Sequence, residues 1–331
     1  MNKKISIISA VLFGVGLLIT FGALIAIGFN FDKIVDISKE SIEIKQNFNS
    51  ISLDCSSADI VIKPSSNGKC GMETVCSRGA AIKYSVERNE LKIKEEIDFS
   101  RSFFYTGDNT VTIYLPKDKY KSLKIHGSSA DTRIDEVDFE QAEILASAGD
   151  IVINSRINEL KIKVSAGDVI INGMEARVLN ITSSSGDVTI KNTSVKESAT
   201  LETSTGDVKL EETVVGKNLS VKTSTGDIEA KKLSAVNLVA RVSTGEIELE
   251  NVVVTGEMKL NSKSGDVELD RCDAQFLKIE TSSGDVEGTL LTNKIFYTKS
   301  GSGDISVPKS TEGGMCEITT GSGDVTFRFA K

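Results

Sequence analysis

An acidic residue that follows a small-residue turn recurs along most of the chain at an almost constant spacing. The turn reads Ser-Ser-Gly, Ser-Thr-Gly or Ser-Ala-Gly, as in the segment 184–186 before Asp187. Successive acids lie 18 to 20 residues apart, at Asp131, Asp150, Asp168, Asp187, Asp207, Asp227, Glu246, Asp266, Asp285, Asp304 and Asp324. A repeat of this length is typical of a solenoid, in which each repeat forms one rung that stacks on its neighbour.

Each turn lies between two short segments in which apolar and polar residues alternate. Leu179 and Ile181 precede the turn at Asp187, and Val188 and Ile190 follow it. This period of two indicates strands with one buried face. Two clear strands in each rung of 19–20 residues predict an all-β fold, a parallel β-solenoid. Strands of successive rungs would pair in register about 4.8 Å apart.

The turn residues have separate expected roles. Glycine relaxes the steric limit on a sharp bend. The acid that follows can accept a hydrogen bond from a nearby backbone amide. Ala130 replaces the glycine before Asp131, which indicates that small size alone suffices in that rung, without a positive φ.

The first 30 residues differ from the rest. After Lys3 and Lys4, the run from Ile5 to Phe29 contains no charged residue. As a helix this run would span roughly 37 Å, enough to cross a bilayer. A cleaved signal peptide is the alternative, although its apolar region is usually only about 7–15 residues long. We therefore expect a transmembrane anchor over residues 1–30. The basic residues before it favour a single-pass cell-membrane protein with a cytoplasmic N-terminus and an extracytoplasmic solenoid.

The rest of the chain is expected to form three segments. Residues 31–46 read as a polar juxtamembrane linker, residues 47–122 as a first rung with a strand-rich insertion or cap, and residues 123–331 as regular solenoid repeats. The regular repeats are expected to stack in chain order as far as Phe327 and Phe329, whose rings would close the far end.

The insertion itself leaves two structures open. The first rung has its turn at Asp59, and 72 residues separate this acid from Asp131. The segment 64–122 is therefore either an insertion or a set of degenerate rungs, and Asn89-Glu90 within it suggests a hairpin.

Aromatic residues gather in one loop of this segment, at Phe103, Phe104 and Tyr105. One interpretation is a cap that covers the exposed end of the solenoid, as such folds need. The other is a loop that contacts a partner.

Two columns of acids are predicted to run along one part of the solenoid. They would combine the turn acids with glutamates two residues later: Asp227, Glu229, Glu246, Glu248, Asp266, Glu268, Asp285 and Glu287. We expect a solvated acidic face that holds no metal. Weak binding of a divalent cation is the alternative, because hard cations prefer clustered oxygen ligands.

No pattern in the chain predicts catalysis or a cofactor. The only histidine, His126, has no nucleophile pattern around it, and the five cysteines lack zinc-site spacing. Cys70 and Cys76 are close enough in sequence for a small disulfide, with free thiols as the alternative. The net charge of −8 argues against nucleic acid as a partner.

The repeated Ser-Ser-Gly-Asp-Val-x-Ile, preceded by Leu-x-Ile-x-Thr-Ser, resembles the repeat of the bacterial "putative adhesin" family, a β-strand-repeat domain of unknown function. The resemblance covers residues 45–331 and implies a cell-envelope protein with a β-solenoid ectodomain. The first functional hypothesis is a surface interaction or adhesion module that binds protein or glycan. The second is an envelope sensor or regulatory scaffold that partners other membrane proteins.

Overall fold

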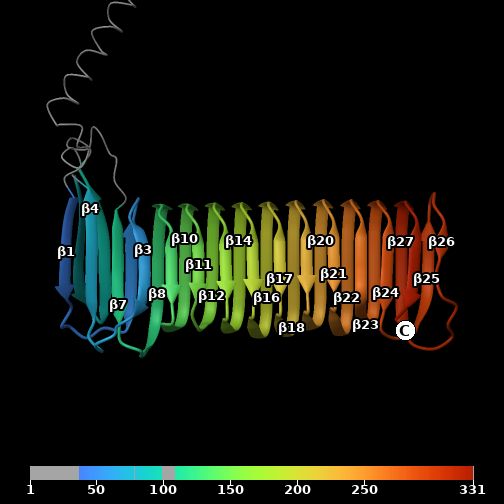
Figure 1. The fold of residues 1–331 in the computed structure, drawn as a ribbon, viewed down its shortest axis with the longest axis horizontal. Coiled ribbons are helices and arrows are strands. Elements are labelled where there is room, and N and C mark those ends of the chain that lie inside the picture. The colour runs from blue at the N-terminus through green and yellow to red at the C-terminus, as the bar shows by residue number, and fades with distance from the viewer. Residues whose placement is uncertain (1–36, 78, 99–108, 331) are drawn as a thin grey trace, which may run out of the picture.

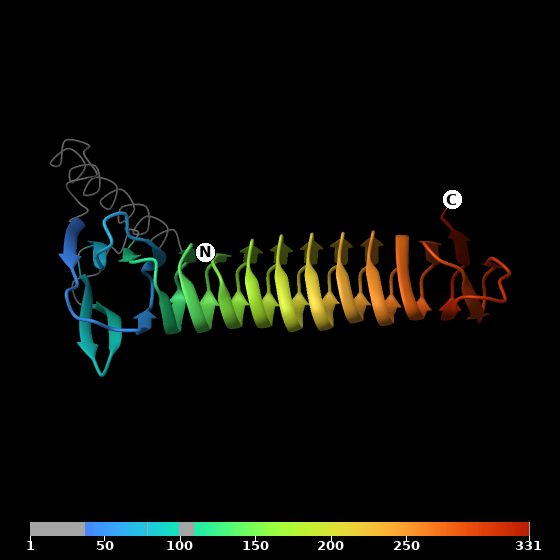
Figure 2. The same cartoon turned by 90° about the horizontal axis from the view of Figure 1, so that it is seen from below.

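The structure, a computed structural model, describes residues 37–77, 79–98 and 109–330. Every regular element in these ranges is a β-strand. The strands lie side by side along one long axis (Figures 1 and 2). The predicted all-β parallel solenoid is confirmed for this part of the chain.

Each regular rung contributes a long strand to one sheet and a short strand to the opposite sheet. The long strands are β8 (Lys119–Ser129), β10 (Asp138–Ala148), β12 (Ile157–Ala166), β14 (Glu175–Ser185), β16 (Ser194–Thr205), β18 (Val214–Thr225), β20 (Ser234–Thr244) and β22 (Val253–Ser264). The short strands are β9 (Thr132–Asp135), β11 (Ile151–Asn154), β13 (Val169–Asn172), β15 (Val188–Lys191), β17 (Val208–Glu211), β19 (Ile228–Lys231) and β21 (Ile247–Glu250). β23 (Val267–Ser283) passes through a corner and pairs in both sheets.

The core forms because equivalent apolar residues of successive rungs stack in register. Leu179 pairs with Leu160 on one side and Ala199 on the other, and all three are buried. In the short-strand sheet, Val188 is buried between Val169 and Val208. A period of two within strands and of about 19 along the chain therefore produces one continuous apolar interior.

The turn glycines hold a conformation that other residues cannot adopt. From Gly149 to Gly284 their φ angles lie between +106° and +144°. At Gly226, φ is +131° and a Cβ atom would lie 2.3 Å from the carbonyl oxygen of Gly206 in the rung before. Small size alone therefore does not suffice in these turns. The expectation drawn from Ala130 holds only for its own rung, where φ is not positive and the methyl group is buried.

A column made mostly of hydroxyl residues lies inside the solenoid, three residues before the turn glycine of each rung. The Thr223 hydroxyl donates to the carbonyl oxygen of Gly206 at 3.0 Å, whereas the hydroxyls of Ser262 and Thr281 are buried without a partner in the structure. Val242 occupies the same column between Thr223 and Ser262. A valine side chain therefore fits this column.

Thr281→Val is expected to stabilise the protein by about 1 kcal/mol, because it removes an unsatisfied buried hydroxyl and conserves volume. Thr223→Val is the matched control. It should destabilise the protein by about 1 kcal/mol, since it removes a hydrogen bond that is made. Urea denaturation of both variants measures the difference. A loss of stability in Thr281→Val as large as that in Thr223→Val would contradict this account.

The N-terminal end combines a displaced rung with antiparallel strands. Its elements are β1 (Ile37–Glu43), β2 (Ser50–Cys55), β3 (Asp59–Pro64), β4 (Gly71–Ser77), β5 (Ala80–Glu87), β6 (Glu90–Ile97) and β7 (Thr110–Leu115). β2 pairs with β8 on one side and β6 on the other, and β3 pairs with β9 and β7. The rung formed by β6 and β7 thus stacks outside the first rung, on the side away from β8 and β9. In the chain, however, β6 and β7 lie between the first rung and β8.

Three antiparallel strands complete this end. β5 pairs with β6 through the expected hairpin, in which Arg88 and Asn89 both have positive φ. β4 pairs with β7, and β1 pairs with β4. The insertion therefore contains both a further rung and a cap. Residues 37–43 of the expected linker form β1, which joins this cap by pairing with β4.

At the C-terminal end the last two rungs stack in reversed order. The elements are β24 (Val286–Leu290), β25 (Lys294–Ser300), β26 (Ile305–Ser306), β27 (Gly314–Ser322) and β28 (Val325–Phe329). β27 and β28 pair directly with β23 and β24, and β25 and β26 stack outside them. The expected stacking in chain order is wrong here.

The contact of Phe327 with Gly288 gives the physical reason for this order. A Cβ atom at Gly288 would lie 2.3 Å from the Phe327 ring, so the ring occupies the space where other rungs carry an inward side chain. Phe327 is buried, and its ring centroid lies 5.7 Å from that of Phe296 in the outer rung. Phe327 and Phe329 therefore do not close the far end.

Candidate functional site

The turn acids connect neighbouring rungs. The Oδ1 of an aspartate accepts a hydrogen bond from the backbone N–H of the acid in the adjacent rung, at 2.8 to 3.0 Å. Glu246 donates in this way to Asp227, but no such bond from Asp266 to the Glu246 carboxylate is present among the described residues. The bonds follow the spatial order of the rungs, so Asp285 accepts from Asp324 and Asp324 accepts from Asp304. The turn acids Asp227, Asp266 and Asp285 therefore have a structural role.

The second acidic column lies on the outer face of the short-strand sheet. Glu229, Glu248, Glu268 and Glu287 pair in register on adjacent strands. Lys209 lies 3.2 Å from Glu229 and neutralises that end. Among the described residues, no ion pair involves Glu248, Glu268 or Glu287. We call these three exposed residues the glutamate row.

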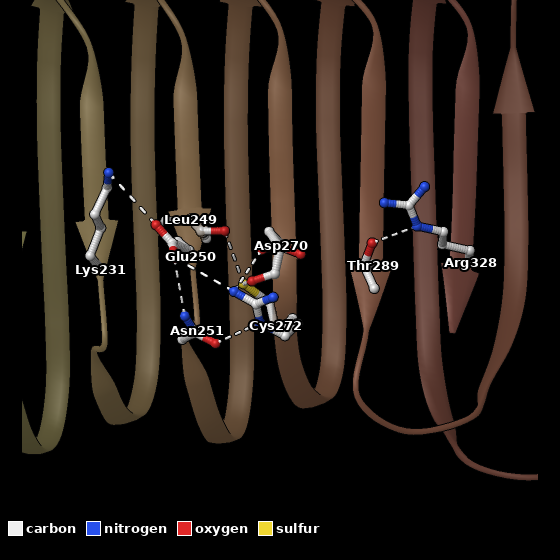
Figure 3. A network of polar contacts seen from close by, with 9 residues as sticks. Lys231, Leu249, Glu250, Asn251, Asp270, Cys272, Thr289 and Arg328 are labelled. Carbon is white, nitrogen blue, oxygen red and sulfur yellow. Dashed lines mark hydrogen bonds and ion pairs between the residues drawn. The ribbon is translucent and has the colours of Figure 1, made fainter. Parts of the chain in front are cut away.

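A groove of about 330 Å³ runs beside the glutamate row, with Lys231 and Arg328 among its lining residues. Lys231 lies 3.6 Å from the Glu250 carboxylate, and the Arg328 Nε donates to the Thr289 hydroxyl at 2.9 Å (Figure 3). Arg271 pairs with Asp270 at 3.0 Å. The acids at the edge of the groove are therefore paired with basic residues, whereas those of the glutamate row have no such pair in the described part of the chain.

Burial and neighbouring charges perturb Glu248, the first residue of the row. Partial burial, and then the adjacent carboxylates of Glu229 and Glu268, raise the pKa of Glu248 above its usual value. Because the folded chain favours protonated Glu248, its contribution to stability is present at low pH. That contribution is lost as the pH rises through the folded-state pKa. Ionised Glu248 thus opposes folding at neutral pH.

Glu248→Gln is accordingly expected to raise the melting temperature at pH 7, and the gain should disappear on acidification below about pH 4.5, the ordinary glutamate value. Glu202→Gln is the matched control, because Glu202 pairs in register with Thr182 and Lys222 and not with another acid. Equal effects of the two substitutions at neutral pH would disprove charge repulsion in the row.

The two acidic columns do not create a recognisable metal centre. Within the residues that the structure describes, no group of three or more histidine, cysteine or acidic side chains is arranged to hold a metal ion. In Asp227, Asp266 and Asp285 the Oδ1 already accepts a backbone N–H group, which reduces the capacity of these turn acids to bind a cation.

Thermal melts of the full-length chain in millimolar calcium and in chelator are expected to differ little. Binding that is specific to the folded state would raise the melting temperature with ligand concentration. A large upward shift in calcium would contradict the prediction. Asp227, Glu229, Glu246, Glu248, Asp266, Glu268, Asp285 and Glu287 would then be the first residues to substitute.

Several residues singled out by their sequence pattern do not gather into a site. Phe103, Phe104 and Tyr105 lie outside the described residues, as does the run from Ile5 to Phe29. In the part of the chain that is described, no helix has the length and apolar character to cross a bilayer. His126 is exposed on the long-strand sheet. The anchor and the aromatic contact loop therefore stay predictions.

The cysteines are free thiols. Of the two alternatives left open for Cys70 and Cys76, this structure therefore has the free thiols and not the small disulfide. Burial raises the pKa of Cys70 to about 11. It also raises the pKa of Cys55, Cys272 and Cys316 to about 12 in each case. These thiols are protonated at neutral pH and are poor nucleophiles.

Sequence reasoning missed a buried polar cluster at the N-terminal end. Glu95 is buried, and its carboxylate accepts from the Ser57 N–H at 2.7 Å, the Ser57 hydroxyl at 2.8 Å and the Ala58 N–H at 3.2 Å. The Asn109 amide donates to it at 2.9 Å. The available signal was a glutamate at an inward position, two residues after Ile93 in a strand with period two.

A comparison with protein families identifies the chain's relatives. The family model described as "Toastrack DUF4097" matches residues 48–232 and 217–331. The chain belongs to this family of domains of unknown function. No curated protein matches the chain.

Several solved structures also resemble the chain. One from Bacteroides fragilis, described as a "putative adhesin", is 16% identical, with 88% of this chain and 97% of that chain covered and a TM-score of 0.36. A "putative adhesin" from Parabacteroides distasonis is also 16% identical, with coverages of 76% and 97% and a TM-score of 0.41. A "putative lipid binding protein" from the same species is 15% identical, with coverages of 88% and 96% and a TM-score of 0.36.

Proposed function

We propose that this Toastrack protein is a membrane-anchored, extracytoplasmic β-solenoid that acts as a non-catalytic surface interaction or adhesion module. The run from Ile5 to Phe29 would serve as the anchor. The partner would be a protein or glycan at the cell surface.

The glutamate row is the observation that carries the proposal. Ion pairs neutralise many acids elsewhere on the rod, whereas Glu248, Glu268 and Glu287 have no ion pair within the described chain and lie on three adjacent strands. Partial burial and repulsion from the neighbouring carboxylates raise the pKa of Glu248, so ionised Glu248 opposes folding and the fold itself does not require its charge. Residues that weaken the fold are typical of functional surfaces, and a single-sign row attracts partners with the opposite charge.

Protease treatment of intact cells tests the location. We expect external protease to release the rod, because the anchor would leave it outside the membrane. Protection of the rod from protease, with cleavage only after lysis, would contradict the adhesion function.

The function is tested by measuring how cells, or the purified full-length protein, bind to a surface that carries cell-surface protein or glycan. The triple substitution of the glutamate row by glutamine should weaken binding without lowering the melting temperature. Replacing Phe103, Phe104 and Tyr105 by alanine should also weaken it if that loop contributes contact area. Unchanged binding in both variants, together with a defect in envelope signalling on deletion, would favour the sensor or scaffold instead.

A further inference from the structure

The two ends of the solenoid rod differ in whether further strands pair with the outermost rung. At the N-terminal end, antiparallel strands β5 and β4 cover the outermost rung. At the C-terminal end, the outermost strand β25 pairs with β27 along one edge, and no described strand pairs with its other edge. A seven-residue edge with free backbone N–H and C=O groups is a template for pairing with another chain.

Apolar side chains also gather at this end. Nine large hydrophobic residues are exposed in the described chain, and four of them lie here: Leu291, Tyr297, Ile305 and Met315. Tyr297, in the middle of β25, is the most exposed at 58%. Phe296 and Val307 are only partly buried, and they line a cavity of about 560 Å³ between β25 and residues 307–312. The apolar interior of the rod is therefore incompletely covered.

We propose that the C-terminal end binds a second copy of the chain tail to tail, with β25 of one copy paired antiparallel to β25 of the other about a two-fold axis at Tyr297. An extended peptide would pair with the strand edge but would leave the apolar end of the core uncovered. A second rod end supplies both a strand and an apolar cross-section. The contact is isologous and closes on two copies.

The residues of β25 are self-complementary in this register. Tyr297 lies against its own copy, Phe296 lies opposite Thr298, and Ile295 lies opposite Lys299, so no like charges face each other. Lys294 is buried and forms an ion pair with Asp273, which keeps its charge away from the contact.

The C-terminal end has a small area, so the contact between one pair of chains is weak. Seven residues extend about 23 Å and the two sheets lie about 10 Å apart, so the end covers on the order of 230 Å² per copy. Stable complexes bury roughly 800 Å² per partner. Such a contact holds two cell surfaces together only when many copies of the chain on one surface pair with copies on the other. This last step rests on the proposed adhesion function, whereas the pairing itself does not.

Site-specific cross-linking of the full-length chain in detergent tests the pairing. Tyr297→Cys should give a disulfide-linked dimer on oxidation, because the two-fold axis sets the two thiols against each other. Val236→Cys is the control, since Val236 is an exposed apolar residue (40%) in the regular part of the rod. The native thiols add little background because they are largely buried. Equal dimer yields from the two variants would overturn the proposal.

Charge substitutions in the Tyr297→Cys background test the register. Ile295→Lys should lower the dimer yield several-fold, because it faces Lys299 of the second copy, whereas Ile295→Glu should maintain or raise it. Equal yields from these two variants would also overturn the proposed pairing. Because detergent samples need no cell-surface display, protease results on intact cells fail or succeed independently of this test.

Discussion

Gly226→Ala is expected to destabilise the rod by about 3 to 5 kcal/mol, one of the two largest effects that we predict for a single substitution. The alanine would have to hold φ near +131°, in a region that only glycine adopts readily. Its Cβ atom would also lie 2.3 Å from the Gly206 carbonyl oxygen. That atom is backbone and belongs to the adjacent rung, so relief requires the two rungs to separate. Urea denaturation gives the loss, and hydrogen exchange should show it concentrated around the Asp207 and Asp227 turns.

Gly127→Ala is the matched control for this prediction. Gly127 also lies near a turn, but its φ is not positive and the nearest atom to a Cβ would be 3.7 Å away. Alanine there should change stability by less than about 1 kcal/mol. If both glycines tolerated alanine, the turn geometry would not be what fixes the spacing of the rungs.

Glu95→Ala is expected to cost about 3 kcal/mol or more, because it removes the buried carboxylate that accepts from the N–H groups of Ser57 and Ala58 and from the Asn109 amide. Glu95→Gln keeps the shape and one acceptor oxygen and should cost less. Glu96→Ala is the surface control. It removes an exposed ion pair with Lys83 and should cost less than about 1 kcal/mol.

The ionisation of Glu95 gives this prediction a second readout. Burial by itself would raise the pKa of Glu95, but the hydrogen bonds from Ser57, Asn109 and Ala58 outweigh it and hold the pKa below its usual value. The stabilisation is therefore present above the ordinary glutamate pKa and is lost as the pH falls through the folded-state pKa. Wild-type protein should lose this stability on acidification, and Glu95→Gln should not. Parallel pH profiles of the two proteins would contradict the role of the ionised carboxylate.

The candidate surface was only partly predictable. The sequence predicted the column of Glu229, Glu248, Glu268 and Glu287, because a fixed repeat places equivalent residues on adjacent strands. It did not show that Lys209 neutralises one end of the column, while no described ion pair reaches the rest. Ion pairs depend on side-chain reach between strands, which spacing alone does not contain.

The sequence by itself determined the repeating architecture of this protein. Period two fixed the buried face of each strand, and the small-residue turn with its acid fixed where each rung bends, as at Gly186 and Asp187. These features are local and repeat many times, so each rung supports the same interpretation. Stacking in register then follows, because a slip by one residue would expose the apolar column.

Only the tertiary structure decided the order of the rungs at the two ends. The repeats at Asp304 and Asp324 carry the same Gly-Ser-Gly-Asp turn, so either could stack on the rung of Asp285. The fit of the Phe327 ring against Gly288 selects the later one. At the other end, Glu95 reaches the turn of a rung that precedes it in the chain. Both choices depend on contacts between residues about 40 positions apart, which a local pattern cannot specify.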